Sequence, residues 1–125
     1  MDENIHNYLY KYQIYISGEI PNCDNYKLKS HLEDNYDLMC YISRIEDKDE
    51  EKLVTLMGSS LMIVMCQNNE NQNKEINTAR RLKIPILFIY NAVYVQKTYP
   101  VNEGEYKIFF EDFENIDTFL KDRFK

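Results

Sequence analysis

The most regular pattern of apolar and polar positions lies in the stretch SLMIVMCQNNENQNKEINTARRLKIPILFIY, residues 60–90. Residues 61–66 and 84–90 are apolar runs of strand length, and strands that are apolar on both faces are typical of parallel sheets covered by helices. The pattern therefore predicts a strand, a helix and a parallel second strand, joined in a right-handed crossover. Between the two runs, three apolar residues recur at helical spacing: Ile76, Ala79 and Leu82.

A polar segment, residues 67–73, joins the first of these strands to the helix. Asparagine favours turns, so we expect a loop here, with Glu75 in the first turn of the helix that follows. Open α/β sheets bind their ligands at the carboxyl ends of the strands. The sequence therefore places its candidate chemistry at this loop and at Glu75.

The rest of the chain shows further strand-like and helix-like patterns. Periodicity and turn residues predict three more strands, at residues 12–17, 38–45 and 106–110. They also predict three more helices, at residues 25–35, at residues 47–58 and from Asp112 or Asn115 onward.

Two segments lack a clear pattern. Residues 1–7 are polar, and we expect them to be frayed. Residues 92–104 contain Pro100 and Gly104 and no helical stripe. We expect an irregular connection there, in which one interpretation places a short strand at residues 94–97.

Five strands that alternate with helices predict a single α/β domain over residues 1–125. The expected architecture is a flavodoxin-like doubly wound parallel sheet in the spatial order 2-1-3-4-5, with helices on both faces. The fourth helix is expected to be reduced or missing, because residues 92–104 show no helical pattern.

In this order the first and third strands are neighbours, so the loops that follow them face each other across a crevice. Two loops and a helix around one crevice predict a small-molecule pocket. Glu19 either helps to bind a hydroxyl group of the ligand or is a solvated loop acid, and Gly18 either lets a ligand approach the backbone or only ends a strand. The candidate ligand-binding residues are Ser17, Gly18, Glu19, Gln67, Asn68 and Asn69.

Composition excludes several functional classes. The formal net charge is −6, and no basic cluster exceeds Arg80-Arg81, which argues against nucleic-acid and anionic-membrane partners. The 3 cysteines show no C-x-x-C spacing, so we expect neither a metal site nor a disulfide framework. The N-terminus has no apolar signal region and no window has the length of a membrane span, so we expect a cytoplasmic location.

The arrangement around Glu75 resembles that of TIR-like domains. An apolar strand, a polar loop, E-I-x-x-A and an apolar strand opened by I-P-I stand here as MIVMCQNNENQNKEINTARRLKIPILFIY, and YQIYISG is similar to the first strand of that family. The small stand-alone TIR-like proteins of bacteria and archaea are the nearest in size. The same pattern, with IYISG, also resembles nucleoside 2-deoxyribosyltransferases. The resemblance covers about residues 12–90.

Both resemblances imply cleavage of an N-glycosidic bond with a glutamate at the position of Glu75. The TIR-like resemblance implies a nucleotide-binding domain of signalling or defence that takes NAD as a substrate rather than as a cofactor, and that self-associates. The other resemblance implies a nucleoside substrate. A carboxylate can stabilise an oxocarbenium-like transition state, or trap it covalently, from the face opposite the leaving base.

Two other interpretations stay open. An acid in a first helical turn is also what capping and the helix dipole predict, which would give Glu75 a structural role only. The chain could then be a non-catalytic interaction module of the same fold. The position of Glu75, in an open crevice or at the end of its own helix, distinguishes the two.

Overall fold

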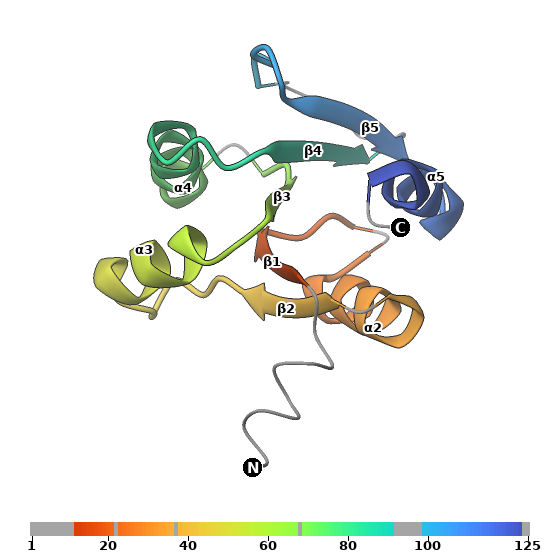
Figure 1. Cartoon of the computed structure of the whole chain (residues 1–125), viewed down its shortest axis with the longest axis horizontal. Helices are drawn as coiled ribbons and strands as arrows, with labels where there is room; N and C mark the ends of the chain where they lie inside the picture. Colours follow the sequence, from red (N-terminus) through yellow and green to blue (C-terminus); the bar gives the residue numbers. More distant parts are fainter. Residues whose placement is uncertain (1–11, 22, 37, 68, 92–98, 124–125) are drawn as a thin grey trace.

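Figure 1 shows the computed structural model of the chain. Three of the predictions lie outside the residues that the structure describes. They concern fraying of residues 1–7, a short strand at residues 94–97 and ligand binding by Asn68. The structure describes residues 12–21, 23–36, 38–67, 69–91 and 99–123.

The described residues contain five strands, namely β1 (Tyr12–Ser17), β2 (Leu38–Ile42), β3 (Leu61–Met65), β4 (Ile86–Asn91) and β5 (Tyr106–Phe110). All neighbouring strands are parallel, and their spatial order is β2-β1-β3-β4-β5. This order confirms the predicted flavodoxin-like doubly wound sheet. The carboxyl ends of β1 and β3 therefore lie side by side.

The described helices are α2 (Asn25–Asn35), α3 (Asp49–Met57), α4 (Glu70–Arg81) and α5 (Phe113–Arg123). In Figure 1, α2 and α5 lie on one face of the sheet, and α3 and α4 lie on the other. Each face has its own hydrophobic core, and β3 and β4, at the centre, are buried along their whole length. None of the described helices is long and apolar enough to cross a membrane.

The alternation of side chains along β1 decides which residues meet α4. Ile14 and Ile16 belong to the core beneath α2 and α5. Tyr15 belongs to the opposite core, with Ile76 and Ala79 of α4. Successive side chains of a strand point to opposite faces, so Ser17 follows Tyr15 onto the α3–α4 side.

The start of α4 differs from the prediction. The helix begins at Glu70, and the loop before it is 67–69 rather than 67–73. The Asn69 side chain caps the helix by accepting a hydrogen bond from the Gln72 backbone N–H at 2.8 Å. The prediction assigned the asparagine-rich tract to a turn, although asparagine is equally favoured as a helix cap. Glu75 consequently lies in the second turn, not the first.

Two strand ends also differ by more than one residue. β2 ends at Ile42 rather than at residue 45, and β4 begins at Ile86 rather than at residue 84. Lys83 has a φ of 60°, and Ile84 donates its backbone N–H back to Ala79 at 2.9 Å. These contacts end α4 and delay the start of the strand.

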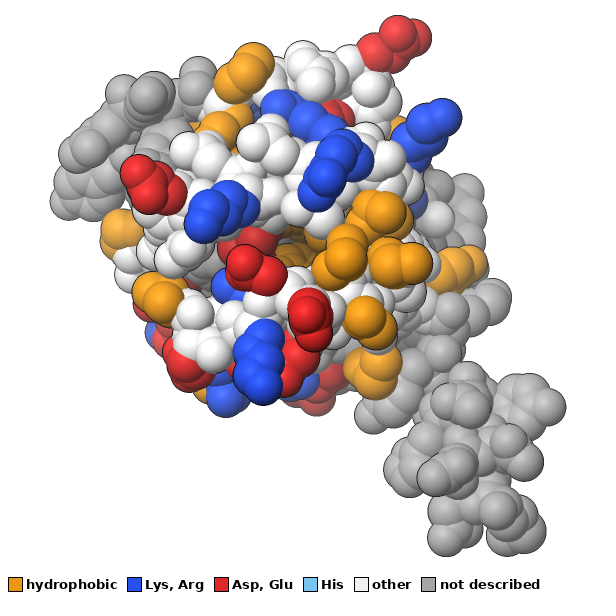
Figure 2. Space-filling model, turned by 90° about the vertical axis from the view of Figure 1, so that its left-hand side faces the viewer, with side chains coloured by type: hydrophobic (Ala, Val, Ile, Leu, Met, Phe, Trp, Pro, Cys, Tyr) orange, Lys and Arg blue, Asp and Glu red, His pale blue; other side chains and the backbone are white. Residues whose placement is uncertain are grey.

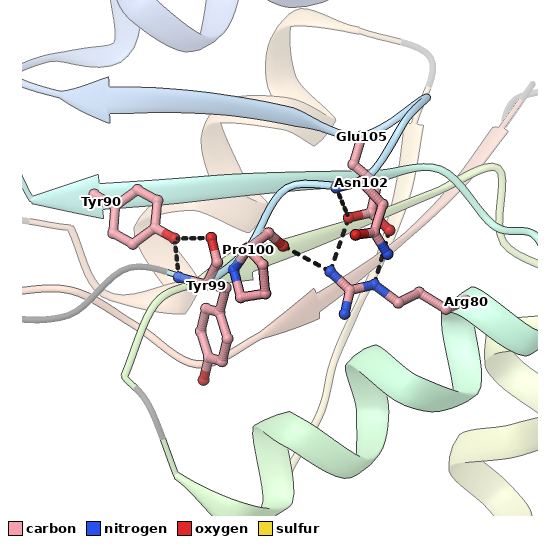
Figure 3. Close-up of polar contacts among 6 residues, drawn as sticks. All are labelled: Arg80, Tyr90, Tyr99, Pro100, Asn102 and Glu105. Carbon is pink, nitrogen blue, oxygen red and sulfur yellow. Dashed lines mark hydrogen bonds and ion pairs between the residues drawn. The ribbon is translucent and has the colours of Figure 1, made fainter.

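No helix lies between β4 and β5 in residues 99–105, the described part of that connection. Instead the segment is held against α4 and β4. Arg80 of α4 binds both carboxylate oxygens of Glu105 at 2.9 Å and the Pro100 carbonyl at 2.8 Å (Figure 3). The Tyr99 ring stacks on Phe88 at a centroid distance of 5.6 Å. Tyr99 of this segment thereby packs against the hydrophobic core on the α3–α4 face.

Candidate functional site

The carboxyl group of Glu75 is held by two hydroxyl groups of the neighbouring strand. Tyr15 Oη donates to Oε2 at 2.5 Å, and Ser17 Oγ donates to Oε1 at 3.2 Å. Glu75 is only 9% exposed. Since Asn69 caps α4, Glu75 has no part in capping its own helix. No lysine, arginine or histidine in the described ranges forms an ion pair with it.

The Tyr15 hydroxyl remains a hydrogen-bond donor to this carboxyl group at ordinary pH. Burial, together with the adjacent charge of Glu75, raises the pKa of the Tyr15 hydroxyl well above its usual range. The hydroxyl therefore stays protonated at ordinary pH and orients one oxygen of Glu75. Sequence reasoning missed Tyr15, although its spacing of two from Ser17 placed both on the same face of β1.

A hollow of about 220 Å³ lies at the carboxyl ends of β1 and β3. The topology argument placed the candidate residues around such a crevice, and the structure brings the described ones together there. Arg44 and Lys52, which the sequence did not single out, also line it. The candidate residues in its lining are Ser17, Gly18, Glu19, Gln67, Asn69 and Glu75.

The structure assigns Gly18 a packing role. Its φ is +80°, a conformation that favours glycine. A Cβ atom at this position would lie 2.5 Å from the Met65 carbonyl oxygen and 2.6 Å from Gln72 Nε2. The atoms that approach Gly18 closely therefore belong to the protein and not to a ligand. The loop after β1 packs directly against the end of β3 and the start of α4.

Gln72 is a buried residue that sequence reasoning missed. Its Nε2 donates to the Met65 carbonyl at 2.9 Å and to the Ser17 carbonyl at 3.3 Å. Its Oε1 accepts from the Gln67 backbone N–H at 2.9 Å and from Tyr99 Oη at 2.7 Å. Gln72 thus joins the ends of β1 and β3 to the segment after β4. The spacing 72, 75, 76, 79 is that of one buried helix face, and this pattern could have revealed it.

A second, larger hollow of about 390 Å³ lies between α3 and α4. Figure 2 looks onto this face and shows the hollow near its centre, with acidic side chains at the rim and lysine and arginine side chains beside it. Glu75 and Lys52 line both hollows, so the two are adjacent. The sequence did not predict this hollow. Its size depends on the distance between α3 and α4, which a pattern of apolar and polar positions does not contain.

Comparison with known proteins identifies no relative. No protein-family model, curated protein or solved structure matches this chain.

Metal chemistry has no ligand set in the described part of the chain. No group of three or more His, Cys, Asp or Glu side chains is placed there to hold a metal ion. All three cysteines are free, and burial raises the pKa of the thiols of Cys23 to about 11 and of Cys66 to about 12. These thiols are therefore poor nucleophiles and poor metal ligands at neutral pH.

The surroundings of Glu75 have the features that a carboxylate-assisted reaction needs. Glu75 is shielded from bulk water, oriented by two donors, and placed where two hollows meet. A carboxylate in such a site can stabilise a developing cation more strongly than it could in water. The protein interior screens the attraction between the two charges less than water does.

Proposed function

We propose that this protein binds a nucleotide in these hollows and cleaves its N-glycosidic bond, with Glu75 as the catalytic residue and NAD as the first substrate to test. The observation that carries the proposal is the position of Glu75. Its carboxyl group is largely buried, has no cation paired with it in the described residues, and faces a hollow instead of its helix end. Acidic side chains are rarely buried unless they are paired, and pockets with convergent polar groups are the usual place of a binding site.

The proposed chemistry assigns a task to the Glu75 carboxylate and to the two hydroxyl groups that hold it. Departure of the base leaves positive charge on the ribose, between the ring oxygen and the anomeric carbon. A Glu75 carboxylate on the opposite face would stabilise this charge or form a glycosyl ester that water then hydrolyses. Tyr15 and Ser17 would act as positioning residues that fix the two carboxylate oxygens.

A second candidate function is supported by the outer surface of α3. Three apolar side chains of this helix are exposed, Leu53 by 39%, Val54 by 68% and Met57 by 61%. Contiguous exposed apolar side chains often mark a protein interface. On this alternative the chain is an interaction module that associates with a second copy of itself through α3.

The proposal is tested by offering the purified protein two substrates in separate long incubations. One is NAD, and the other is 2′-deoxyadenosine together with a free second base. Chromatography then follows the released or exchanged base. We expect nicotinamide to be released from NAD. Base exchange on the deoxynucleoside without action on NAD would identify a deoxyribosyltransferase-type enzyme instead.

Absence of turnover on both substrates would contradict the enzymatic proposal and favour the interaction module. The interaction module has its own check, which is sedimentation of the wild type beside a Val54→Glu/Met57→Glu variant. A concentration-dependent dimer that disappears in the variant would support association through α3.

A further inference from the structure

The hollow between α3 and α4 is more positively charged than the chain as a whole. Three cationic side chains line it, namely Lys52 of α3 and Lys74 and Arg81 of α4, against two acids, Asp49 and Glu75. The chain itself carries a formal net charge of −6. A local excess of cations in an acidic protein concentrates anionic ligands at that place.

None of these three cations is taken up in an ion pair of the described residues, although the charge of Lys52 acts on Asp47. Arg81 donates from Nη2 to Thr78 Oγ1 at 3.4 Å, which is a contact with a neutral group. The adjacent Arg80 is different, because its Nε and Nη2 each donate to one carboxylate oxygen of Glu105 (Figure 3).

The remainder of the lining is apolar or uncharged. Leu53 and Leu56 of α3 and the ring of Tyr15 contribute the apolar part, and Asn77 and Thr78 contribute polar groups that can accept or donate hydrogen bonds. Small-molecule sites combine an apolar lining with a few polar groups that fix orientation, and a volume of about 390 Å³ is within their usual range. The lining therefore suits a ligand that carries both an anionic group and a less polar body.

We propose that this hollow holds the phosphate-bearing part of the nucleotide, with the phosphate against Lys74 and Arg81 and near Lys52. The ribose then reaches Glu75, which lines the α3–α4 hollow and the strand-end hollow alike. The proposal rests on the proposed function for the identity of the ligand and deepens it, since it requires a phosphorylated nucleoside. It also places part of the ligand between two helices. Doubly wound sheets usually bind the ligand at the strand ends alone.

The test is a comparison of two probes that differ by one phosphate, adenosine and adenosine 5′-monophosphate, by titration calorimetry on the whole protein. We expect the monophosphate to bind at least about tenfold more tightly, because each charge-assisted contact adds to its affinity. The double variant Lys74→Gln/Arg81→Gln should lose most of this preference. The matched control, Lys27→Gln/Lys121→Gln, removes two exposed lysines from helices on the other face and should keep it.

Three results would overturn the inference: equal affinity for the two probes, no binding of the monophosphate, or a phosphate preference that survives in the Lys74→Gln/Arg81→Gln variant. Its failure is distinguishable from failure of the proposed function. Release of nicotinamide without a phosphate preference overturns only the phosphate site. Binding that depends on the phosphate and on Lys74 and Arg81, without any base release, overturns only the catalytic proposal.

Discussion

Position 18 needs a glycine for two separate physical reasons, and a pair of variants can separate them. Gly18 has a φ of +80°, and a Cβ atom there would lie 2.5 Å from a backbone oxygen. Gly104 has a similar φ of +82° but nothing within 4 Å of the Cβ position. The first site combines strain with a collision, whereas the second has strain alone.

We therefore expect Gly18→Ala to lower the free energy of unfolding by about 2–4 kcal/mol, the sum of left-handed strain and overpacking. Gly104→Ala should lower it by about 1 kcal/mol, from strain alone. Urea unfolding of both variants beside the wild type measures the two values. Equal effects would contradict the account of loop packing at the end of β1.

At the same scale, single residues mark where sequence reasoning succeeded and where it failed. Glu75 could be singled out because it follows the loop at the carboxyl end of a strand and because the E-I-x-x-A pattern resembles that of TIR-like domains. Tyr15 and Gln72 could not be singled out as easily, because their roles depend on contacts 60 and 55 residues apart in the chain. Such pairings follow from the register of the strands and the start of α4, which the sequence determines less sharply.

At the scale of elements, side chains of α2 bind the backbone of Cys40 in the edge strand β2. Cys40 donates its backbone N–H to Glu33 Oε2 at 2.9 Å, and its carbonyl accepts from Lys29 Nζ at 2.8 Å. Lys29 and Glu33 also form an ion pair at 3.4 Å. Unpaired groups at a sheet edge invite pairing with another chain, and these two side chains occupy those of Cys40.

Replacing both residues, Lys29→Ala/Glu33→Ala, should expose the edge and promote association between chains. We expect sedimentation to show species larger than the wild type at the same concentration. The control, Lys27→Ala/Asp34→Ala, removes one charge of each sign from exposed positions of the same helix. If the two variants sediment alike, the side chains of Lys29 and Glu33 do not protect the edge.

The elements themselves were largely predictable, since the bounds of α2, β1 and β5 agree with the apolar pattern. The start of α4 was not, because Asn69 and the residues after it are as compatible with a loop as with a capped helix. The error came from treating asparagine as a turn former alone. It placed Glu75 one turn too close to the helix end.

At the scale of the whole molecule, buried acids with raised pKa values predict a loss of stability at alkaline pH. Burial, with the neighbouring Asp117, raises the pKa of Tyr36 to about 12, and burial raises the pKa of Cys40 to about 12. The pKa of Tyr15 is raised as well. The folded chain keeps protons that the unfolded chain releases above their ordinary pKa values, so the free energy of unfolding falls as pH rises through that range.

We expect the urea midpoint to be nearly constant between about pH 7 and 8 and to fall progressively above about pH 9. Tyr15→Phe should make the alkaline fall less steep, because one of the buried ionisable groups is removed. The measurement is a set of urea titrations across this pH range. A midpoint that does not change up to about pH 11 would contradict the burial of these groups.

The overall topology could be predicted because alternating apolar strands and amphipathic helices admit few arrangements. The strand-end hollow followed from that topology. The larger hollow between α3 and α4 did not, since it depends on how closely two helices pack on one sheet face. Helix spacing is set by side-chain sizes at the contact, which a pattern of apolar and polar positions does not contain.

The measurement that tests the central claim most directly compares base release from NAD by the wild type, Glu75→Gln and Glu70→Gln. Both acids belong to α4, but Glu70 is exposed in its first turn whereas Glu75 is buried beside Tyr15 and Ser17. We predict that Glu75→Gln lowers the rate by at least about 100-fold and that Glu70→Gln leaves it unchanged. Equal rates for all three proteins would contradict the assignment of Glu75 as the catalytic residue.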